Sequence, residues 1–189
     1  MNGENEILVV DFEATCWKGE VPEGEFSEII EIGWAKYDFG LKKILDHGGI
    51  YVKPGNSRVS EFCTELTGIT QDTVDGGVSF LEAAKMVKKL GSKNMPWASW
   101  GQYDHNLARI QSGRLAMANP FGSQHLNIKA MFGVLMGLRK APGMDGALSM
   151  VGYNLIGRHH SGADDAYNIA RILRWMHVAF EGAAPEYVG

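Results

Sequence analysis

An apolar stretch near the start of the chain carries two acidic residues, and this combination limits the folds that the chain can adopt. The stretch EILVVDFEATCW is rich in β-branched and aromatic residues, which predicts a strand over Glu6–Ala14. Side chains alternate between the two faces of a strand, so Asp11 and Glu13 point to the same side. Removing an ionised carboxylate from water is costly unless it is paired or binds a metal. Because no lysine precedes Lys18, a divalent cation between the two carboxylates is favoured over a solvated strand end paired with lysine.

The length and composition of the chain are those of one ordinary globular domain. Its 189 residues are 45% hydrophobic and 21% charged, which is enough apolar material for a sizeable core. We expect a single domain over residues 1–189, with a core at about 6–180 and a C-terminal tail at 181–189. The net charge of −4 argues against a broad electrostatic grip on duplex DNA, although it leaves room for a local basic patch.

The cysteine content and the apolar runs bear on the compartment. Cys16 and Cys63 are too few for a disulfide framework or a thiolate zinc site, so two buried reduced thiols are expected. No apolar run approaches the ~20 residues of a membrane-spanning helix. The N-terminal MNGENE is acidic and lacks the basic start of a signal peptide. These features predict a cytoplasmic protein without a membrane partner.

The order of the expected elements indicates the fold class. Three strands come first, at 6–14, 27–39 and 43–55, and predict a meander. Helices interspersed with short strands follow, and one of these helices begins with a capping box formed by Ser79 and Glu82. This order predicts an α/β domain with a mixed sheet. Helices are expected in SEFCTELTGI, SFLEAAKMVKKLG, YDHNLARIQSG, DGALSMVGYN and GADDAYNIARILRWMHVAF, a short strand in WASW, and a short strand running into a helix in SQHLNIKAMFGVLMGL.

The segment RHHSGADDAYNIARILRW contains a third candidate carboxylate. On a helix that begins near Gly162, Asp165 lies on the apolar stripe and therefore points inward. Asp164 lies on a more polar face and is expected to be solvated or to interact with the helix dipole in the first turn. Two acidic residues at a helix start without chemistry are the alternative. The apolar stripe comprises Ile169, Ile172 and Met176, and the polar face comprises Asn168, Arg171 and Trp175.

A fourth candidate is Asp104 in WASWGQYDHNLARIQ. It lies at a strand-to-helix junction, where α/β folds place ligand-binding groups beyond the strand ends. An N-cap or first-turn aspartate explains the same position without any function.

Together, DFEAT, the Asp104 segment and HHSGADDAYNIARIL resemble the three motifs of the DEDDh 3′-to-5′ exonuclease superfamily. That superfamily includes RNase T-like ribonucleases and the proofreading subunit of the bacterial replicative polymerase. Within it, EFCTELTGITQDTVDGGVSF and HSGADDAYNIARI are most similar to the histone-mRNA 3′-end exonuclease subgroup and its small bacterial relatives. The resemblance extends from about Ile7 to Met176. It implies a ribonuclease H-like mixed β-sheet flanked by helices.

The resemblance also implies a two-metal site and a general base. Carboxylate ligands suit hard cations such as Mg²⁺ or Mn²⁺ rather than zinc or copper. Two such ions can activate water and stabilise the leaving 3′ oxygen. His160 matches the family spacing to the final aspartate and is expected to be the general base, with the adjacent His159 as the competing assignment. The implied metal ligands are Asp11, Glu13, Asp104 and Asp165, with Glu13 also counted as catalytic.

The implied substrate is the 3′ end of a single-stranded nucleic acid, with RNA favoured over DNA by the subgroup resemblance, and the implied products are nucleoside 5′-monophosphates. A single-stranded DNA exonuclease of the proofreading type, a non-catalytic nucleic-acid-binding module and a small-substrate metal phosphoesterase are the alternatives. The sequence leaves open whether the protein is a monomer or a homodimer. For Leu66 and Ile69, an ordinary place in the core is an equal alternative to substrate contact. The implied substrate contacts are Ala14, Thr15, Leu66, Ile69 and His160, the first two beside the terminal sugar.

Overall fold

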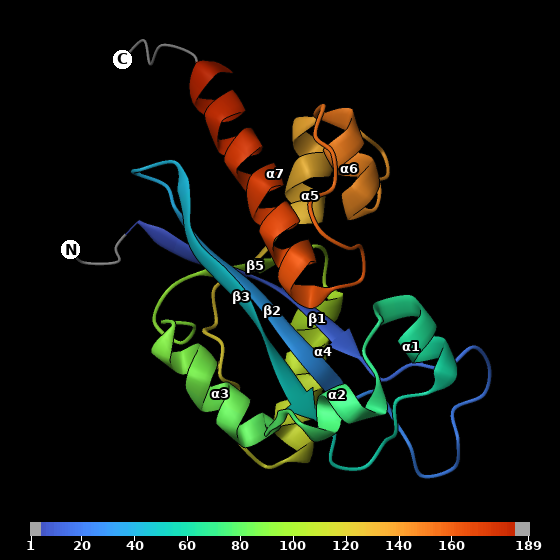
Figure 1. The fold of residues 1–189 in the computed structure, drawn as a ribbon. Helices are drawn as coiled ribbons and strands as arrows, with labels where there is room; N and C mark the ends of the chain where they lie inside the picture. The colour runs from blue at the N-terminus through green and yellow to red at the C-terminus, as the bar shows by residue number, and fades with distance from the viewer. Residues whose placement is uncertain (1–4, 184–189) are drawn as a thin grey trace.

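A computed structural model describes residues 5–183, and its centre is a six-stranded mixed sheet (Figure 1). The strand order is β4-β3-β2-β1-β5-β6. The first three strands form the predicted antiparallel meander, while β5 runs parallel to β1 and β6 runs parallel to β5. The predicted α/β class with a mixed sheet is therefore confirmed. The strands are β1 (Glu6–Ala14), β2 (Ile29–Asp38), β3 (Lys43–Lys53), β4 (Val78–Ser79), β5 (Trp97–Ser99) and β6 (His125–Asn127).

Helices cover both faces of this sheet (Figure 1). Helices α5, α6 and α7 pack on one face, and α3 and α4 pack on the other. Within residues 5–183, no helix is both long and apolar enough to cross a membrane. The helices are α1 (Glu61–Thr67), α2 (Gln71–Asp75), α3 (Phe80–Lys89), α4 (Tyr103–Arg114), α5 (Ile128–Leu135), α6 (Met144–Met150) and α7 (Gly162–Ala183).

Strand β1 divides its side chains between the two cores, as its alternation predicts. Ile7 and Val9 pack with α5, α6 and α7, whereas Leu8 and Val10 pack with α3 and α4. Because the period of a strand is two residues, Asp11 and Glu13 continue the face that looks toward α7. The local pattern thus decides which helix the two carboxylates can meet.

The element boundaries differ from the expected ones in a few places. Helix α2 and strand β4 were not predicted, because five and two residues are too short to show a clear hydrophobic period. The capping box of α3 is confirmed, since Ser79 Oγ accepts the Glu82 amide at 3.3 Å and Glu82 Oε2 accepts the Ser79 amide at 3.0 Å. Helix α7 continues to Ala183, past the expected start of the tail at residue 181, and the remainder of that tail lies outside the described residues.

Candidate active site

The C-terminal end of β1 opens into a cavity of about 470 Å³. The pairing of β5 with β1 brings the start of α4 to this end of the sheet, and α7 approaches it from the other side. The structure therefore gathers residues from three distant parts of the chain. All of the expected metal ligands and the expected base line this cavity, namely Asp11, Glu13, Asp104, His160 and Asp165.

Three of the carboxylates form a tight cluster. One oxygen each from Asp11, Glu13 and Asp165 lies within 4.8 Å of the other two. Asp104 lines the same cavity but stands outside this cluster, and its Oδ1 accepts the backbone N–H of Phe12 at 3.0 Å. It is a buried first-turn residue of α4, whose N-cap position is Gln102. The described side chains thus offer a three-carboxylate group with a fourth carboxylate nearby.

Burial and mutual repulsion disfavour the charged forms of these carboxylates. Burial, reinforced by the neighbouring acidic groups, raises the pKa of Asp11 well above its ordinary value and that of Glu13 to about 8. Burial also raises the pKa values of Asp104 and Asp165 to about 6, although backbone hydrogen bonds oppose the shift. Among the described residues, Asp165 Oδ1 is buried and has no hydrogen-bond partner. A divalent cation would supply both the missing partner and the positive charge, so this donor set fits a hard metal ion.

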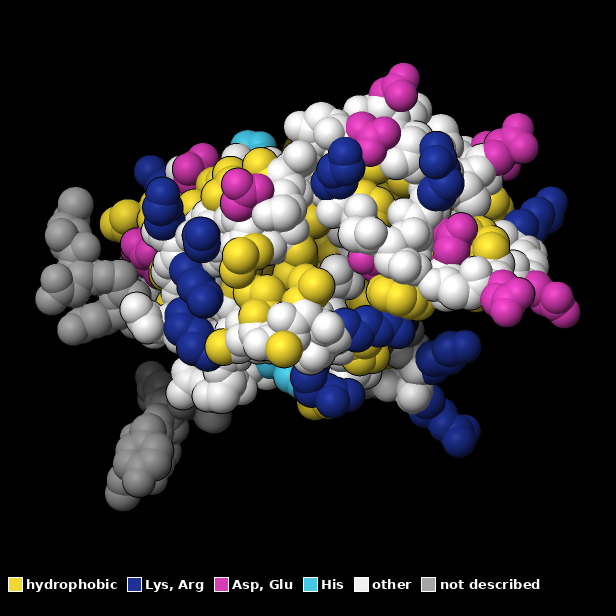
Figure 2. Space-filling model, turned by 90° about the horizontal axis from the view of Figure 1, so that it is seen from below, with side chains coloured by type: hydrophobic (Ala, Val, Ile, Leu, Met, Phe, Trp, Pro, Cys, Tyr) yellow, Lys and Arg dark blue, Asp and Glu magenta, His cyan; other side chains and the backbone are white. Residues whose placement is uncertain are grey.

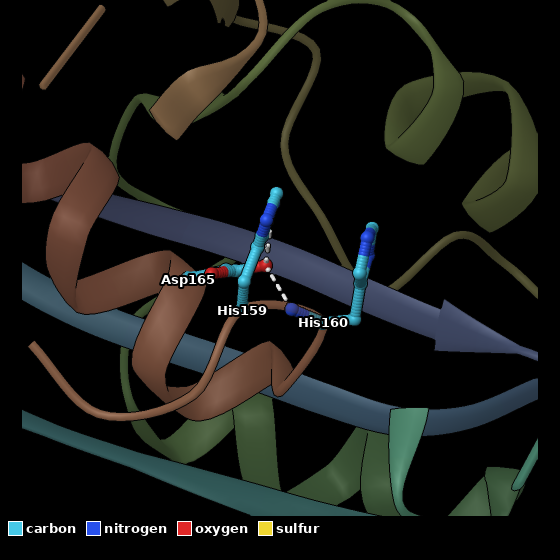
Figure 3. A group of neighbouring side chains, drawn as sticks. All are labelled: His159, His160 and Asp165. Atoms are coloured by element: carbon cyan, nitrogen blue, oxygen red, sulfur yellow. Dashed lines mark hydrogen bonds and ion pairs between the residues drawn. The ribbon is translucent and has the colours of Figure 1, made fainter. Parts of the chain in front are cut away.

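The two histidines lie on the loop that leads into α7 (Figure 3). The backbone N–H of His160 donates to Asp165 Oδ2 at 2.9 Å, and His159 Nε2 lies 3.9 Å from the same oxygen. His160 adopts a left-handed backbone conformation, with φ of 63°. The two imidazole rings stack, with centroids 4.1 Å apart and planes inclined by 9° (Figure 3). Both rings reach the cavity, so this geometry alone does not choose between them.

The environment of His160 favours its neutral form. Burial lowers the pKa of the imidazole, and the positive charges of His159 and Arg158 lower it further. A neutral imidazole can accept a proton from water at physiological pH.

Arg158 ties the histidine loop to α1. Its guanidinium donates to the carbonyl oxygens of Glu65 at 3.3 Å and Leu66 at 3.4 Å. Its backbone N–H donates to Asp164 Oδ2 at 2.8 Å. The expected first-turn position of Asp164 is confirmed, but the expectation of a polar face is wrong for Asn168, which is fully buried. The Asn168 side chain is buried because it satisfies the backbone of residues 156 and 164 with three hydrogen bonds.

The expected substrate contacts divide into two groups. Ala14 and Leu66 line the cavity, together with His160. Ile69 instead lies in the core and is 3% exposed, which corresponds to the alternative weighed for it. Thr15 is fully buried, and its hydroxyl bridges the Phe26 carbonyl and the Glu28 amide.

Three further side chains lie in or near the cavity. Tyr103 lines the cavity and is largely exposed, so it offers a face for base stacking. Cys16 also lines it and is partly exposed, so the expectation of two buried thiols holds only for Cys63. Glu31 was missed altogether, although it is 3% exposed and accepts the backbone amides of Gly162 and Ala163. The signal for Glu31 is the same as for Asp11: it is a carboxylate inside the apolar strand sequence EIIEIG.

A second cavity of about 580 Å³ lies between α5 and α7 but differs in chemistry. It is lined by apolar residues and His177, with no carboxylate, so the carboxylate cavity is the better candidate for chemistry.

On the face shown in Figure 2, basic side chains lie in separate groups with acidic and uncharged side chains between them. That face therefore offers no continuous basic surface for a nucleic acid.

The clustered carboxylates predict an unusual dependence of stability on pH in the absence of metal. Carboxyl groups whose pKa is raised by folding favour the folded state below their unfolded pKa, and this contribution is lost as the pH rises through the folded pKa. In EDTA, we expect the melting temperature to fall as the pH rises from about 4 to about 8. Asp104 and Asp165 lose their contribution as the pH approaches their folded pKa of about 6, and Glu13 loses its contribution as the pH approaches about 8. The free-energy change should be on the order of a few kcal/mol. Scanning calorimetry in EDTA, repeated with Mn²⁺, measures it.

The Glu13→Gln variant is the control for this prediction. It removes the carboxyl group whose pKa is raised to about 8, so between pH 6 and pH 8 its melting temperature in EDTA should change less than that of the wild type. Mn²⁺ should flatten the wild-type profile, because a bound cation stabilises the ionised carboxylates. Parallel profiles for the wild type and Glu13→Gln in EDTA would contradict the raised pKa of Glu13.

The chain is similar in sequence to known exonucleases. The family model RNase T, described as exonuclease, matches residues 8–173. The 3′-5′ exoribonuclease 1 of Homo sapiens is 35% identical over 178 residues, which cover 88% of this chain and 50% of the relative. The 3′-5′ exonuclease Snipper of Drosophila melanogaster is 31% identical over 190 residues, which cover 88% of this chain and 67% of that protein. The chain spans about half the length of the human relative.

The fold is also similar to those of solved exonuclease structures. The nuclease domain of 3′hExo, a DEDDh family member bound to rAMP, superimposes with a TM-score of 0.83 at 32% identity, covering 93% of this chain and 92% of that domain. A 3′-exonuclease that recognises the 3′ end of the histone mRNA stem-loop superimposes with a TM-score of 0.82 at 32% identity, covering 93% and 82%. These similarities confirm the predicted ribonuclease H-like fold with its mixed sheet and flanking helices.

Proposed function

This chain belongs to the exonuclease family represented by the RNase T model, and from that premise we propose that it is a metal-dependent 3′-to-5′ exonuclease. It hydrolyses phosphodiester bonds from the 3′ end of single-stranded RNA and releases nucleoside 5′-monophosphates. The human relative is an exoribonuclease, and one structural neighbour was solved with rAMP bound. Both similarities support an RNA substrate.

One observation carries this proposal. Asp165 belongs to the three-carboxylate cluster, and its Oδ2 accepts the backbone N–H of His160. Asp165 therefore connects the candidate metal site to the loop that carries His160. Such a link brings a proton acceptor close to a metal ion, which is the arrangement that metal-assisted hydrolysis of a phosphodiester requires.

We propose that the site takes two Mg²⁺ or Mn²⁺ ions, held by Asp11, Glu13, Asp104 and Asp165. Bound ions of this kind supply charge stabilisation for the phosphate and lower the pKa of the attacking water. The donors are all carboxylates, and burial and neighbouring acidic groups raise the pKa values of Asp11 and Glu13. A bound cation would stabilise their ionised forms. Asp104 lies farther from the three clustered oxygens and completes the ligand set from α4.

The protein's own residues then orient the substrate and move the proton. His160 accepts the proton of the attacking water at an imidazole nitrogen, for which its neutral form is suited. The backbone at Ala14 meets the terminal sugar, and Leu66 contacts the terminal base at the edge of the cavity. The exposed ring of Tyr103 offers a stacking surface to a neighbouring base. A cytoplasmic location belongs to the same proposal and is supported by two free cysteines.

A preference for RNA is the most direct test of the substrate. We expect labelled single-stranded RNA to be degraded from its 3′ end several times faster than DNA of the same sequence, in Mg²⁺ or Mn²⁺. The physical reason is that the 2′-hydroxyl of the terminal sugar adds a donor and an acceptor that DNA lacks. Initial rates at matched concentrations, with a 3′-blocked RNA as control, measure the preference. Equal rates on RNA and DNA would refute it, and hydrolysis of a chromogenic phosphodiester without hydrolysis of oligonucleotides would refute the exonuclease itself.

A further inference from the structure

We propose that Glu31 is a positioning residue for the catalytic cluster, a role that rests on the proposed function. It holds the start of α7 against the sheet and thereby sets the place of Asp165 relative to Asp11 and Glu13. Glu31 is not itself a member of the three-carboxylate cluster, and its side chain is 3% exposed. Its charge also raises the pKa values of Asp11, Glu13 and Asp165, but its hydrogen bonds go to the backbone at the start of α7, and it is through this backbone that it positions Asp165.

The contacts of Glu31 are with the first two residues of α7. Its Oε2 accepts the N–H of Gly162 at 2.8 Å, and its Oε1 accepts the N–H of Ala163 at 3.2 Å. The first N–H groups of a helix have no partner within the helix, and a carboxylate placed there also interacts favourably with the helix dipole. Both oxygens of a buried side chain on β2 are thus used to fix one helix end.

The start of α7 packs so closely on the sheet that there is no room for side chains between them. A Cβ atom added to Gly33, on the same strand, would lie 1.8 Å from the Gly162 carbonyl oxygen. A Cβ atom at Gly49, on the adjacent strand β3, would lie 2.7 Å from Glu31 Oε1. These two glycines lie directly opposite each other in the β2–β3 register. The sheet therefore carries no side chains at Gly33 and Gly49, and the start of α7 packs directly against the backbone of β2 and β3.

Register then connects this anchor to the metal-binding cluster. Glu31 pairs with Glu13 across β1 and β2, and Gly33 pairs with Asp11. Asp165 follows Gly162 by three residues, so it lies one helical turn beyond the anchored amides. A catalytic constellation tolerates misplacement of only about 0.5 Å. A shift of the helix start would move Asp165 away from the two β1 carboxylates, which stay in place on the strand.

Glu28 provides a matched control for the experiment. Its side chain is also buried, at 5% exposure, and its carboxylate likewise accepts hydrogen bonds from backbone amides. Its oxygens accept the N–H groups of Gly55, Asn56 and Ser57 at 2.9, 2.9 and 2.6 Å, so it anchors the loop after β3 instead of α7. Glu28→Gln therefore reports what the loss of a buried carboxylate anchor does to stability alone.

The experiment compares the wild type, Glu31→Gln and Glu28→Gln by three measurements: melting temperature, Mn²⁺ binding by titration calorimetry, and kcat and KM on single-stranded RNA. Both variants should melt at lower temperature than the wild type. Only Glu31→Gln should bind Mn²⁺ more weakly, by about 10–100-fold, because supporting residues around metal ligands have effects of that size. It should also lower kcat with KM nearly unchanged.

Several results would overturn the proposal. Wild-type Mn²⁺ affinity in Glu31→Gln would show that Glu31 only stabilises the fold, and an equal loss of affinity in Glu28→Gln would show the same. Glu31→Asp keeps the charge on a shorter side chain and should also lose Mn²⁺ affinity, whereas wild-type affinity in this variant would show that Glu31 acts through its charge alone. Glu31→Asp also replaces Glu31→Gln in the comparison if the latter does not fold. Absence of Mn²⁺ binding by the wild type would also refute the proposal. Absence of nuclease activity with intact Mn²⁺ binding would refute the proposed function alone, because the calorimetric comparison still decides the role of Glu31.

Discussion

Asp165→Asn is expected to lower the rate of 3′-end hydrolysis by at least about 10³-fold while leaving the fold intact. The amide has nearly the shape of the carboxylate, but it removes one negative charge from the three-carboxylate cluster. It also places either an N–H₂ group or a neutral oxygen at the position of Oδ1, which now has no partner among the described residues. Asp11→Asn removes a charge from the same cluster and should have an effect of similar size. Initial rates on end-labelled RNA with Mn²⁺, together with circular dichroism, measure both.

The matched control for this prediction is Asp164→Asn. Asp164 is adjacent in sequence and lies on the same first turn of α7, but its Oδ2 accepts the Arg158 amide instead of joining the cluster. An asparagine oxygen can accept that N–H as well, so we expect less than about a 10-fold change in rate. Near-normal rates in Asp165→Asn or Asp11→Asn would refute the metal-dependent mechanism. A large loss of rate in Asp164→Asn would instead indicate that the rate depends on the loop before α7, which Asp164 binds through the Arg158 amide.

His160→Gln is expected to lower kcat by roughly 10²–10⁴-fold, the range found for a general base. Glutamine preserves the backbone N–H that binds Asp165 Oδ2, so the variant removes the imidazole without removing that hydrogen bond. Mn²⁺ binding should therefore stay within a few-fold of wild type, which separates loss of the base from loss of the metal site. Single-turnover rates and titration calorimetry make the comparison.

His159→Gln distinguishes the two histidines, which stack on one another and share the cavity. We expect a loss of less than about 10-fold in kcat, because its neighbour retains the role of proton acceptor. The lower limb of the pH–rate profile should persist in His159→Gln and disappear in His160→Gln. The opposite pattern would assign the base to His159, and equal small losses in both variants would exclude either imidazole as an essential base.

The periodic features of this chain could be predicted from its sequence because they are local. The alternation of β1 puts Asp11 and Glu13 on one face, and the helical period of α7 turns Asp165 inward. The capping box at Ser79 depends only on residues three apart, and it too is confirmed. The resemblance of three short segments to family motifs then led to the fold class, which the mixed sheet confirms.

Residues that contact distant parts of the chain were placed less well. Ile69 and Thr15 matched substrate-contacting positions, yet Ile69 packs in the core and Thr15 bonds the backbone beside β2. Asn168 was expected on a polar face, but it is buried because it satisfies the loop at residue 156. Thr15 and Asn168 bond backbone groups eleven to thirteen residues away along the chain, and the core around Ile69 includes Ile30 of β2. A hydrophobic period within one segment carries no information about such partners.

The amino-acid order alone was enough to say which side chains share a face, because backbone geometry imposes periods of 2 and 3.6 residues wherever a strand or helix forms. How closely those faces meet was decided by strand register and by the sites where the sheet carries no side chain. Gly33 and Gly49 let α7 lie on the backbone of β2 and β3, and Glu31 binds its first amides there. The resulting distance between Asp165 and the β1 carboxylates is a property of the packed sheet and helix together, which no single segment of the chain encodes.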